Sequence, residues 1–134
     1  MFEKIFIYLF MVDSEKMEQD FIIDKLTNSI VNSISGDSFE TEVLFVEKAD
    51  LKETTKKNGW NFNWSTEFKN IEKEVYKLTI VNNQKIVQGL LSLTIENDHV
   101  FMNLLESAPF NIGQAKLYEG VPGNLVAFAC KVSF

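Results

Sequence analysis

The sequence contains few of the residues on which many kinds of functional site depend. Its 134 residues include a single cysteine, Cys130, and a single histidine, His99. One cysteine excludes an internal disulfide and any cysteine-based metal cluster, and one histidine argues against a histidine-rich zinc site. We therefore expect no metal, and a reducing, cytoplasmic compartment.

Basic residues and long apolar runs are also scarce. Lys and Arg number 13 against 19 Asp and Glu, which gives a formal net charge of −6. Because nucleic-acid binding depends on clustered basic residues, we expect no nucleic-acid partner. Residues 5–12 are continuously apolar, but eight residues are too few to span a bilayer, and the run lacks the flanks of a signal peptide. We expect a buried strand there and no membrane partner.

What is present is typical of a globular protein. Hydrophobic residues make up 46% of the chain and charged residues 24%, so we expect residues 1–134 to form a single domain with a mixed α/β (α+β) fold. Ser14 is a plausible N-cap, and isoleucine or leucine then recurs every four residues up to Ile34. This spacing predicts an amphipathic helix that ends at Gly36.

The middle of the chain predicts mainly strands. Residues 39–47 are rich in β-formers, residues 50–57 suggest a short helix, and residues 65–74 form a charged helix or loop. Residues 75–81, 86–96 and 99–105 are separated by Asn-Asn and Asn-Asp turn signals, which predicts an antiparallel meander of three strands. Gly89, within the second of these strands, is expected to mark a bulge or a close approach.

Three large aromatic residues alternate with asparagine in the segment Trp60-Asn61-Phe62-Asn63-Trp64. A period of two places the rings of Trp60, Phe62 and Trp64 on one side of an extended segment. They are candidates for substrate binding. A local core, or a lid over one, is the more common role of such a cluster, and a stacking platform for bases conflicts with the acidic charge.

The last part of the chain carries the strongest functional signal. The segment Tyr118-Glu119-Gly120-Val121-Pro122-Gly123-Asn124 precedes a helix predicted from Leu125 to Phe134 that is apolar nearly all round and must be buried on several sides. A meander, a glycine-bearing turn and a helix is also the arrangement that holds the pyrophosphate of coenzyme A in the GNAT acetyltransferases. Free backbone N–H groups and the positive end of the helix dipole attract phosphate there.

From Gly36 to Phe134 the chain resembles a group of bacterial GNAT-like proteins, most closely in "YKLTIVNNQKIVQGLLSLTI", "DHVFMNLLESAPFN" and "KLYEGVPGNLVAFACKVSF". The resemblance implies acetyl-CoA as cofactor and direct transfer of its acetyl group to an amine of a small molecule or peptide. It also implies a meander followed by a phosphate-loop helix. A GNAT domain continues beyond that helix with further strands and a helix, so we expect the fold to be incomplete at its carboxyl end.

The resemblance also suggests site residues. It places Leu104 and Leu105 on the strand beside the pantetheine arm, and Glu106 at the end of that strand is the candidate base for removing a proton from the amine. The phosphate-loop pattern Arg/Gln-x-x-Gly-x-Gly/Ala matches in part: Gly123 on its last glycine puts Tyr118 on the Arg/Gln, whereas Gly120 on its middle glycine puts Leu117 there. The expected cofactor-binding residues are Leu104, Leu105, Tyr118, Gly120, Val121, Pro122, Gly123, Asn124 and Leu125.

Two residues with reactive side chains are given ordinary roles. Cys130 lies in an apolar stretch and is expected to be inert core, and His99 starts a strand and is expected at the surface. The alternative to an enzyme is a non-catalytic GNAT-like module for interaction or oligomerisation. In either case an open strand edge and an apolar helix predict a homodimer.

Overall fold

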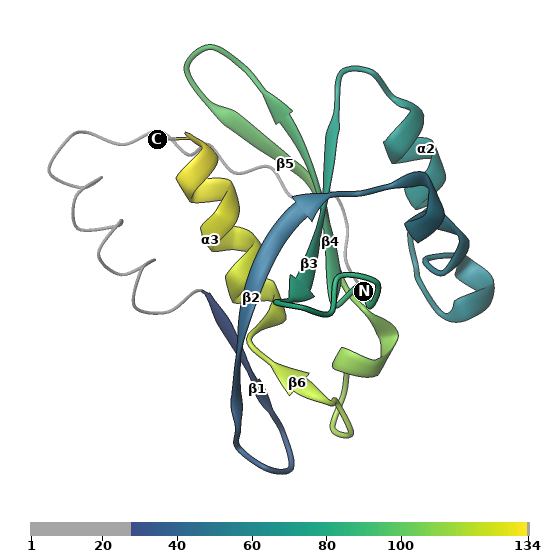
Figure 1. Cartoon of the computed structure of the whole chain (residues 1–134). Helices are drawn as coiled ribbons and strands as arrows, with labels where there is room; N and C mark the ends of the chain where they lie inside the picture. The colour runs from purple at the N-terminus through teal and green to yellow at the C-terminus, as the bar shows by residue number, and fades with distance from the viewer. Residues whose placement is uncertain (1–27, 134) are drawn as a thin grey trace, which may run out of the picture.

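The computed structural model describes residues 28–133, and the structural statements below concern this part of the chain. Its centre is a six-stranded antiparallel sheet in the order β5-β4-β3-β2-β1-β6, curled into a half-barrel, with one long helix packed on it (Figure 1). The fold is therefore of the α+β class. The strand predicted at residues 5–12 and most of the helix predicted after it lie outside the described residues.

The strands follow the sequence closely in the middle of the chain. Neighbouring strands from β1 to β5 are adjacent and antiparallel in chain order, so the predicted meander is confirmed and extended by β2. The two-residue strand β6 closes the other edge by pairing with β1. The bounds are β1 Ser29–Asn32, β2 Ser38–Phe45, β3 Glu74–Ile80, β4 Gly89–Ile95, β5 Val100–Ser107 and β6 Tyr118–Glu119.

The helix predicted up to Gly36 is wrong for residues 28–36, which form β1 and the turn to β2. Ile30 is fully buried on a strand, whereas Ile34, assigned to the same helical stripe, is 91% exposed in the turn. The Asn32 side chain accepts hydrogen bonds from the backbone N–H groups of Ile34 and Ser35, and Gly36 has a φ of 77°. This local turn chemistry stabilises a hairpin, and the pairing of β1 with β2 and β6 outweighs the helical periodicity.

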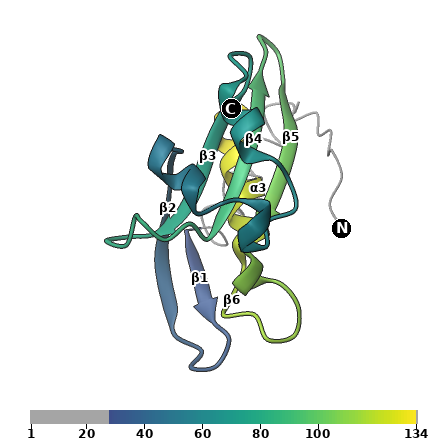
Figure 2. The same ribbon diagram turned by 90° about the vertical axis from the view of Figure 1, so that its right-hand side faces the viewer.

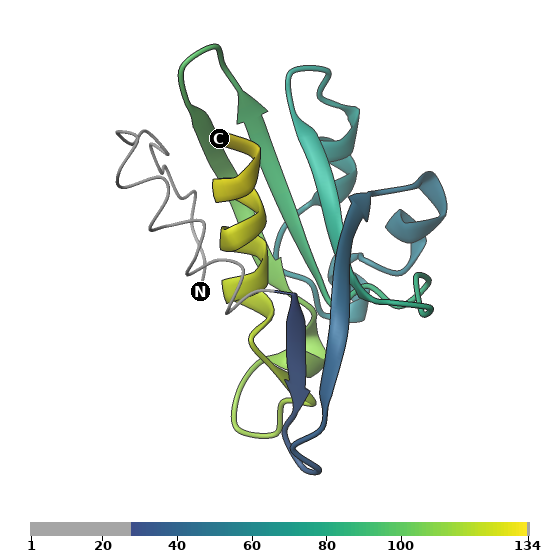
Figure 3. The same cartoon turned by 60° about the vertical axis from the view of Figure 1, so that its left-hand side comes forward.

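Helix α3 (Val121–Ser133) covers one face of the sheet with a mainly apolar contact. Figure 3 shows it running back along the strands, and its side chains Leu125 and Ala129 pack against Leu78, Leu91 and Met102. The helix begins at Val121, four residues before the start predicted from the sequence. Its close approach depends on Gly89, where a Cβ would lie 2.7 Å from Val121 Cγ1, so the predicted close approach at Gly89 is confirmed.

Short helices cover the opposite face of the sheet (Figure 2). They hold a second apolar cluster, in which Trp60 and Trp64 pack against Val75, Leu90 and Leu104. The two layers therefore bury different faces of the same strands. The short helices are η1 Lys48–Lys52, η2 Lys56–Asn58, α2 Trp64–Lys69 and, after β5, η3 Pro109–Asn111.

Strand β5 carries a bulge. Ser92 pairs with Leu104 while Leu93 pairs with Met102, which leaves Asn103 as the extra residue. The Asn103 side-chain amide donates a hydrogen bond to Thr94 Oγ1 at 2.8 Å.

Within residues 28–133, no helix combines the length and the apolar character that crossing a bilayer requires.

Candidate functional site

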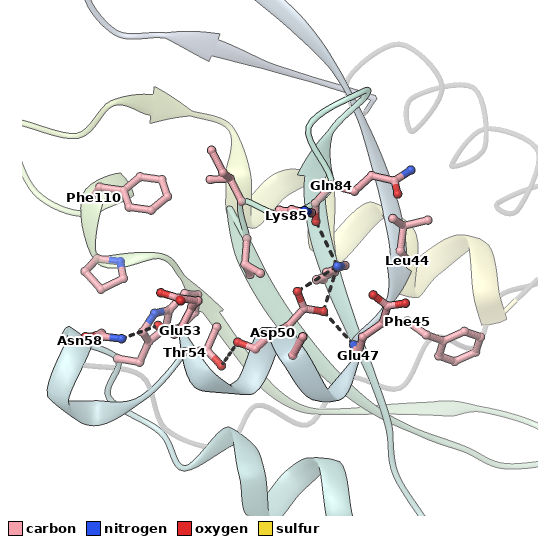
Figure 4. A pocket seen from close by; sticks show the side chains of 16 residues that line it. Leu44, Phe45, Glu47, Asp50, Glu53, Thr54, Asn58, Gln84, Lys85 and Phe110 are labelled. Carbon is pink, nitrogen blue, oxygen red and sulfur yellow. Dashed lines mark hydrogen bonds and ion pairs between the residues drawn. The ribbon is translucent and has the colours of Figure 1, made fainter.

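The described part of the chain contains a cleft of about 1130 Å³ on the face opposite α3. Figure 4 shows it from nearby, with Asp50 at its centre, Glu53 and Asn58 at the end near Phe110, and Glu47 at the other end. It lies between η1, the β3–β4 connection and the turn after β5. Its apolar lining includes Leu44, Trp60, Ile86, Val87, Pro109 and Phe110.

A buried ion pair lies at the bottom of this cleft. Lys77 on β3 and Asp50 on η1 have side chains only 5% and 8% exposed, and Lys77 Nζ lies 2.9 Å from Asp50 Oδ2. Lys77 Nζ also donates to the Gln84 carbonyl oxygen at 3.0 Å, and Asp50 Oδ2 accepts from the Glu47 backbone N–H at 2.8 Å. Because both charges are paired and hydrogen-bonded, they are tolerated in this buried position.

Glu106, the candidate base, is fully buried at the end of β5. One of its carboxylate oxygens accepts a hydrogen bond from the Asn61 N–H at 2.6 Å. The other accepts from the Phe62 N–H at 3.3 Å and from Trp64 Nε1 at 2.8 Å. These contacts fix the aromatic segment to the sheet and leave the carboxylate inaccessible to an amine. The geometry gives Glu106 a structural role.

The three aromatic residues belong to the second apolar cluster. Trp64 is 1% and Trp60 5% exposed, and Phe62 packs edge-on against Trp64 with ring centroids 6.4 Å apart. The segment is not extended throughout, because α2 begins at Trp64 with the Asn63 side chain as its N-cap. A local core is therefore the role that this packing supports. Trp60 in addition contributes to the lining of the cleft.

The expected phosphate loop forms the first turn of α3. Gly120 precedes the helix with a φ of 99°, in the left-handed region that favours glycine. Val121 and Leu125 are buried against the sheet, whereas Gly123 is exposed and a Cβ there would meet no atom within 4 Å. Pro122 has no backbone N–H to offer. Of this group, Gly123 is therefore the residue most open to a ligand.

Asn124, also expected to bind the cofactor, anchors α3 to the sheet. Its side-chain nitrogen donates to the Ser29 and Gly120 carbonyl oxygens at 2.9 and 2.7 Å. Its side-chain oxygen accepts from Thr41 Oγ1 at 2.7 Å. Both amide hydrogens are thus used within the protein. Asn124 holds β1, β2 and the start of α3 together.

The remaining expected cofactor residues are divided between the two layers. Leu104 packs in the cluster on the cleft face, and Leu105 packs on the α3 face. Tyr118 pairs with Asn32 in β6, and its ring meets Phe39 edge-on at 5.9 Å. The structure brings Gly120 to Leu125 together at the start of α3 and places Tyr118 just before them, but Trp60, Phe62 and Trp64 lie on the opposite face.

The two residues with reactive side chains take ordinary positions. Cys130 is 6% exposed within α3, and burial raises the pKa of its thiol, so it is the inert core residue that we expected. His99 lies next to the turn between β4 and β5, with its Nδ1 2.6 Å from Asp98 Oδ1. Its ring packs edge-on against Phe101.

The cleft and its ion pair were not predicted from the sequence. A usable signal was present, because Lys77 is the only charge in a run of seven residues, Val75–Val81, that otherwise holds apolar residues and Thr79. A lysine in the middle of such a strand requires a buried partner. The sequence does not show which acid supplies it, since Asp50 lies 27 positions away.

The fold and these sites define an α+β protein with a half-barrel sheet, one face sealed by a helix and the other holding a polar cleft. No family model, no curated protein and no solved structure matches the chain.

Proposed function

We propose that this chain is an acetyl-CoA-binding domain of the GNAT type, which transfers an acetyl group to an amine. The observation that carries the proposal is the order of its elements. Strands β2 to β5 are adjacent and antiparallel in chain order, α3 follows β5 and packs on one face, and short helices pack on the other (Figures 1 and 2). This is the order that the resemblance of the segments from Gly36 onward implies.

Two local features support cofactor binding beside β5. Asn103 forms a bulge in the middle of that strand, and a bulge takes a residue out of the regular ladder and re-aims its neighbours. After β5, the chain leads to the α3 start, where Gly123 is exposed. The first turn of a helix offers unpaired N–H groups and a positive dipole end, which favour a pyrophosphate.

In the proposed reaction, the amine nitrogen bonds to the acetyl carbon while the carbon–sulfur bond of the thioester breaks. The proton lost by the amine ends on the departing thiol, so that the products are an amide and free coenzyme A. Backbone N–H groups beside the bulge are the candidates for stabilising the negative charge on the carbonyl oxygen. Because Glu106 is buried and fully engaged, we assign proton removal to water and not to that carboxylate.

Thermal unfolding with and without acetyl-CoA tests this proposal. A ligand that binds only the native state raises the free energy of unfolding by about 2.7 kcal/mol at a concentration of 100 Kd. We expect acetyl-CoA to raise the midpoint and an equal concentration of acetate to leave it unchanged. An unchanged midpoint with acetyl-CoA, in a chain that unfolds cooperatively, contradicts the proposal.

Substitutions at Gly123 sharpen the test without damage to the fold, since this position is open. Gly123→Asp places a negative charge where the helix dipole favours one, so we expect a folded protein of equal or higher stability that no longer responds to acetyl-CoA. Gly123→Ala is the matched control and keeps the response. If acetyl-CoA shifts the unfolding midpoint of both variants equally, the pyrophosphate does not bind at the start of α3.

A second candidate function, an interaction module, has an observation of its own. Several large apolar side chains are exposed around the β1–β2 turn and the segment before β6, including Ile34 at 91%, Ile112 at 47% and Leu117 at 45%. The Ser33 N–H donates to the Leu117 carbonyl oxygen at 2.8 Å, which joins the two segments. We expect a homodimer in sedimentation that Leu117→Ser weakens, and a monomer at all concentrations would exclude this function.

A further inference from the structure

We propose that the cleft between η1, the β3–β4 connection and the turn after β5 binds an organic cation with an apolar or aromatic body. None of its lining residues belongs to the first turns of α3, so the inference does not depend on acetyl-CoA binding. The cleft volume of about 1130 Å³ is large enough for a small organic molecule.

The charges around the cleft favour a cation over an anion. Lys77 is the best-placed basic group, but Asp50 lies 2.9 Å from it and neutralises it. The Gln84 carbonyl oxygen accepts a further hydrogen bond from the same ammonium group. Lys77 therefore has little capacity left for an anionic ligand.

The remaining charged side chains of the lining are the carboxylates of Glu47 and Glu53 and the ammonium group of Lys85. All three residues are exposed. Two carboxylates against one ammonium group make the potential in the cleft negative, in agreement with the net charge of −6 for the whole chain. A cation is thus attracted, and an anion is repelled.

The apolar lining at one end accounts for the apolar part of the ligand. Trp60, Pro109 and Phe110 line the cleft together with Val87, and Figure 4 shows Glu53 at the end near Phe110. Phe110 is 38% exposed although it is a large aromatic residue. An aromatic ring beside a carboxylate is a favourable environment for an ammonium group attached to an apolar body, through cation–π and ionic attraction.

The buried ion pair explains how the cleft keeps its shape. Asp50 ties η1 to Lys77 on β3, and the Thr54 hydroxyl donates to the Asp50 carbonyl oxygen at 3.2 Å. On the other side, the Ala108 N–H donates to the Gln88 carbonyl oxygen at 2.9 Å, just before Pro109. The carboxylate of Glu53 and the ring of Phe110 thus project from segments that the sheet holds in place, which favours a pre-formed site.

The two tryptophans allow a test with an internal control. Trp60 lines the cleft, whereas Trp64 is 1% exposed and its indole N–H donates to Glu106. The probes are 2-phenylethylammonium and phenylacetate, which share an aromatic ring and differ in the sign of their charge. Titrations of the full chain are followed by the two indole N–H signals in NMR spectra, assigned with the variant Trp60→Phe.

We expect 2-phenylethylammonium to shift the Trp60 signal with a Kd on the order of 1 mM, as for other ligands of this size, and to leave the Trp64 signal in place. Phenylacetate is expected to bind at least about fivefold more weakly. Glu53→Gln and Phe110→Ala each weaken binding of the cation about threefold, while Glu72→Gln, at an exposed position outside the cleft, leaves it unchanged. Equal shifts with both probes, or no shift with either, would overturn the proposal.

Discussion

The two faces of the sheet bury their side chains in different ways. On the α3 face, Leu78, Leu91 and Leu125 are fully buried in a cluster of apolar side chains. On the cleft face, a carboxylate and an ion pair are buried beside Trp60 and Trp64, and each charge has hydrogen-bond partners. The α3 face depends on apolar packing together with the uncharged hydrogen bonds of Asn124, whereas the cleft face depends on packing and on complete pairing of its buried charges.

This difference separates stability from function. An apolar contact tolerates conservative changes of volume but offers no charged group with which to bind a polar ligand. A substitution that removes one partner of a buried charge pair is more destabilising, because one unpaired charge in a low-dielectric environment is strongly unfavourable. Buried charges also hold polar side chains in fixed positions, and the cleft lies on this face. We therefore expect substitutions of charge to have the largest effects on the cleft face.

The largest effect is expected at the buried ion pair. Lys77→Met leaves the Asp50 carboxylate buried without its partner, and the free energy of unfolding should fall by about 3–5 kcal/mol in urea titrations. The double variant Asp50→Leu/Lys77→Met removes both charges and should recover most of that loss. Lys52→Met, at an exposed position on η1, serves as the control. A double variant less stable than Lys77→Met would show that the pair itself stabilises the fold.

A smaller loss is expected at Glu106. Glu106→Gln keeps the size of the side chain but replaces one acceptor oxygen by an NH2 group, which then faces an N–H donor of the aromatic segment. The cost should be about 3 kcal/mol, because hydrogen bonds to a charged group are among the stronger ones. If the Glu106 role is structural, any acetyl transfer should fall only in proportion to the folded fraction, measured by circular dichroism at the assay temperature. A much larger fall in the rate would restore it as the base.

On the α3 face, stability should depend on side-chain volume and not on charge. Gly89→Ala places a methyl group 2.7 Å from Val121 Cγ1 and 3.0 Å from Leu125 Cδ1, so the free energy of unfolding should drop by about 2 kcal/mol. Adding Val121→Ala removes the closer of these contacts. The two substitutions should therefore be less harmful together than the sum of their separate effects. Strict additivity in thermal unfolding would mean that the contact with Val121 is not the source of the loss caused by Gly89→Ala.

The sequence predicted the centre of the fold better than its edges and its sites. Turn signals at Asn82-Asn83 and Asn97-Asp98 indicated the meander correctly because local turn chemistry specifies a hairpin. Periodicity failed at Ile30 and Ile34, because β1 pairs with its neighbour β2 through a local turn and also with β6, which is distant in the sequence. The cleft was beyond sequence reasoning for the same reason: Asp50, Lys77 and Phe110 come from three separate segments.

The smallest effect that we expect is a dependence of the free energy of unfolding on pH, which arises from two titrating groups on the α3 face. Burial, and then the neighbouring Glu74 carboxylate that accepts its hydroxyl hydrogen bond, raise the pKa of Tyr76 above the ordinary 10.0; burial raises the pKa of Cys130 above 9.0. Above pH 9 the unfolded chain loses these protons before the native chain does, so it binds fewer protons and the free energy of unfolding falls as pH rises.

Urea titrations between pH 8 and pH 11 measure this dependence. Tyr76→Phe should reduce the loss of unfolding free energy above pH 10, and Cys130→Ala should reduce the loss that begins near pH 9. Each substitution removes one titrating group with a raised pKa. Substituting the exposed Lys52 by Met should leave both parts of the curve in place. A wild-type stability that stays constant to pH 11 would mean that water reaches both groups, and that the α3 face is looser than its packing indicates.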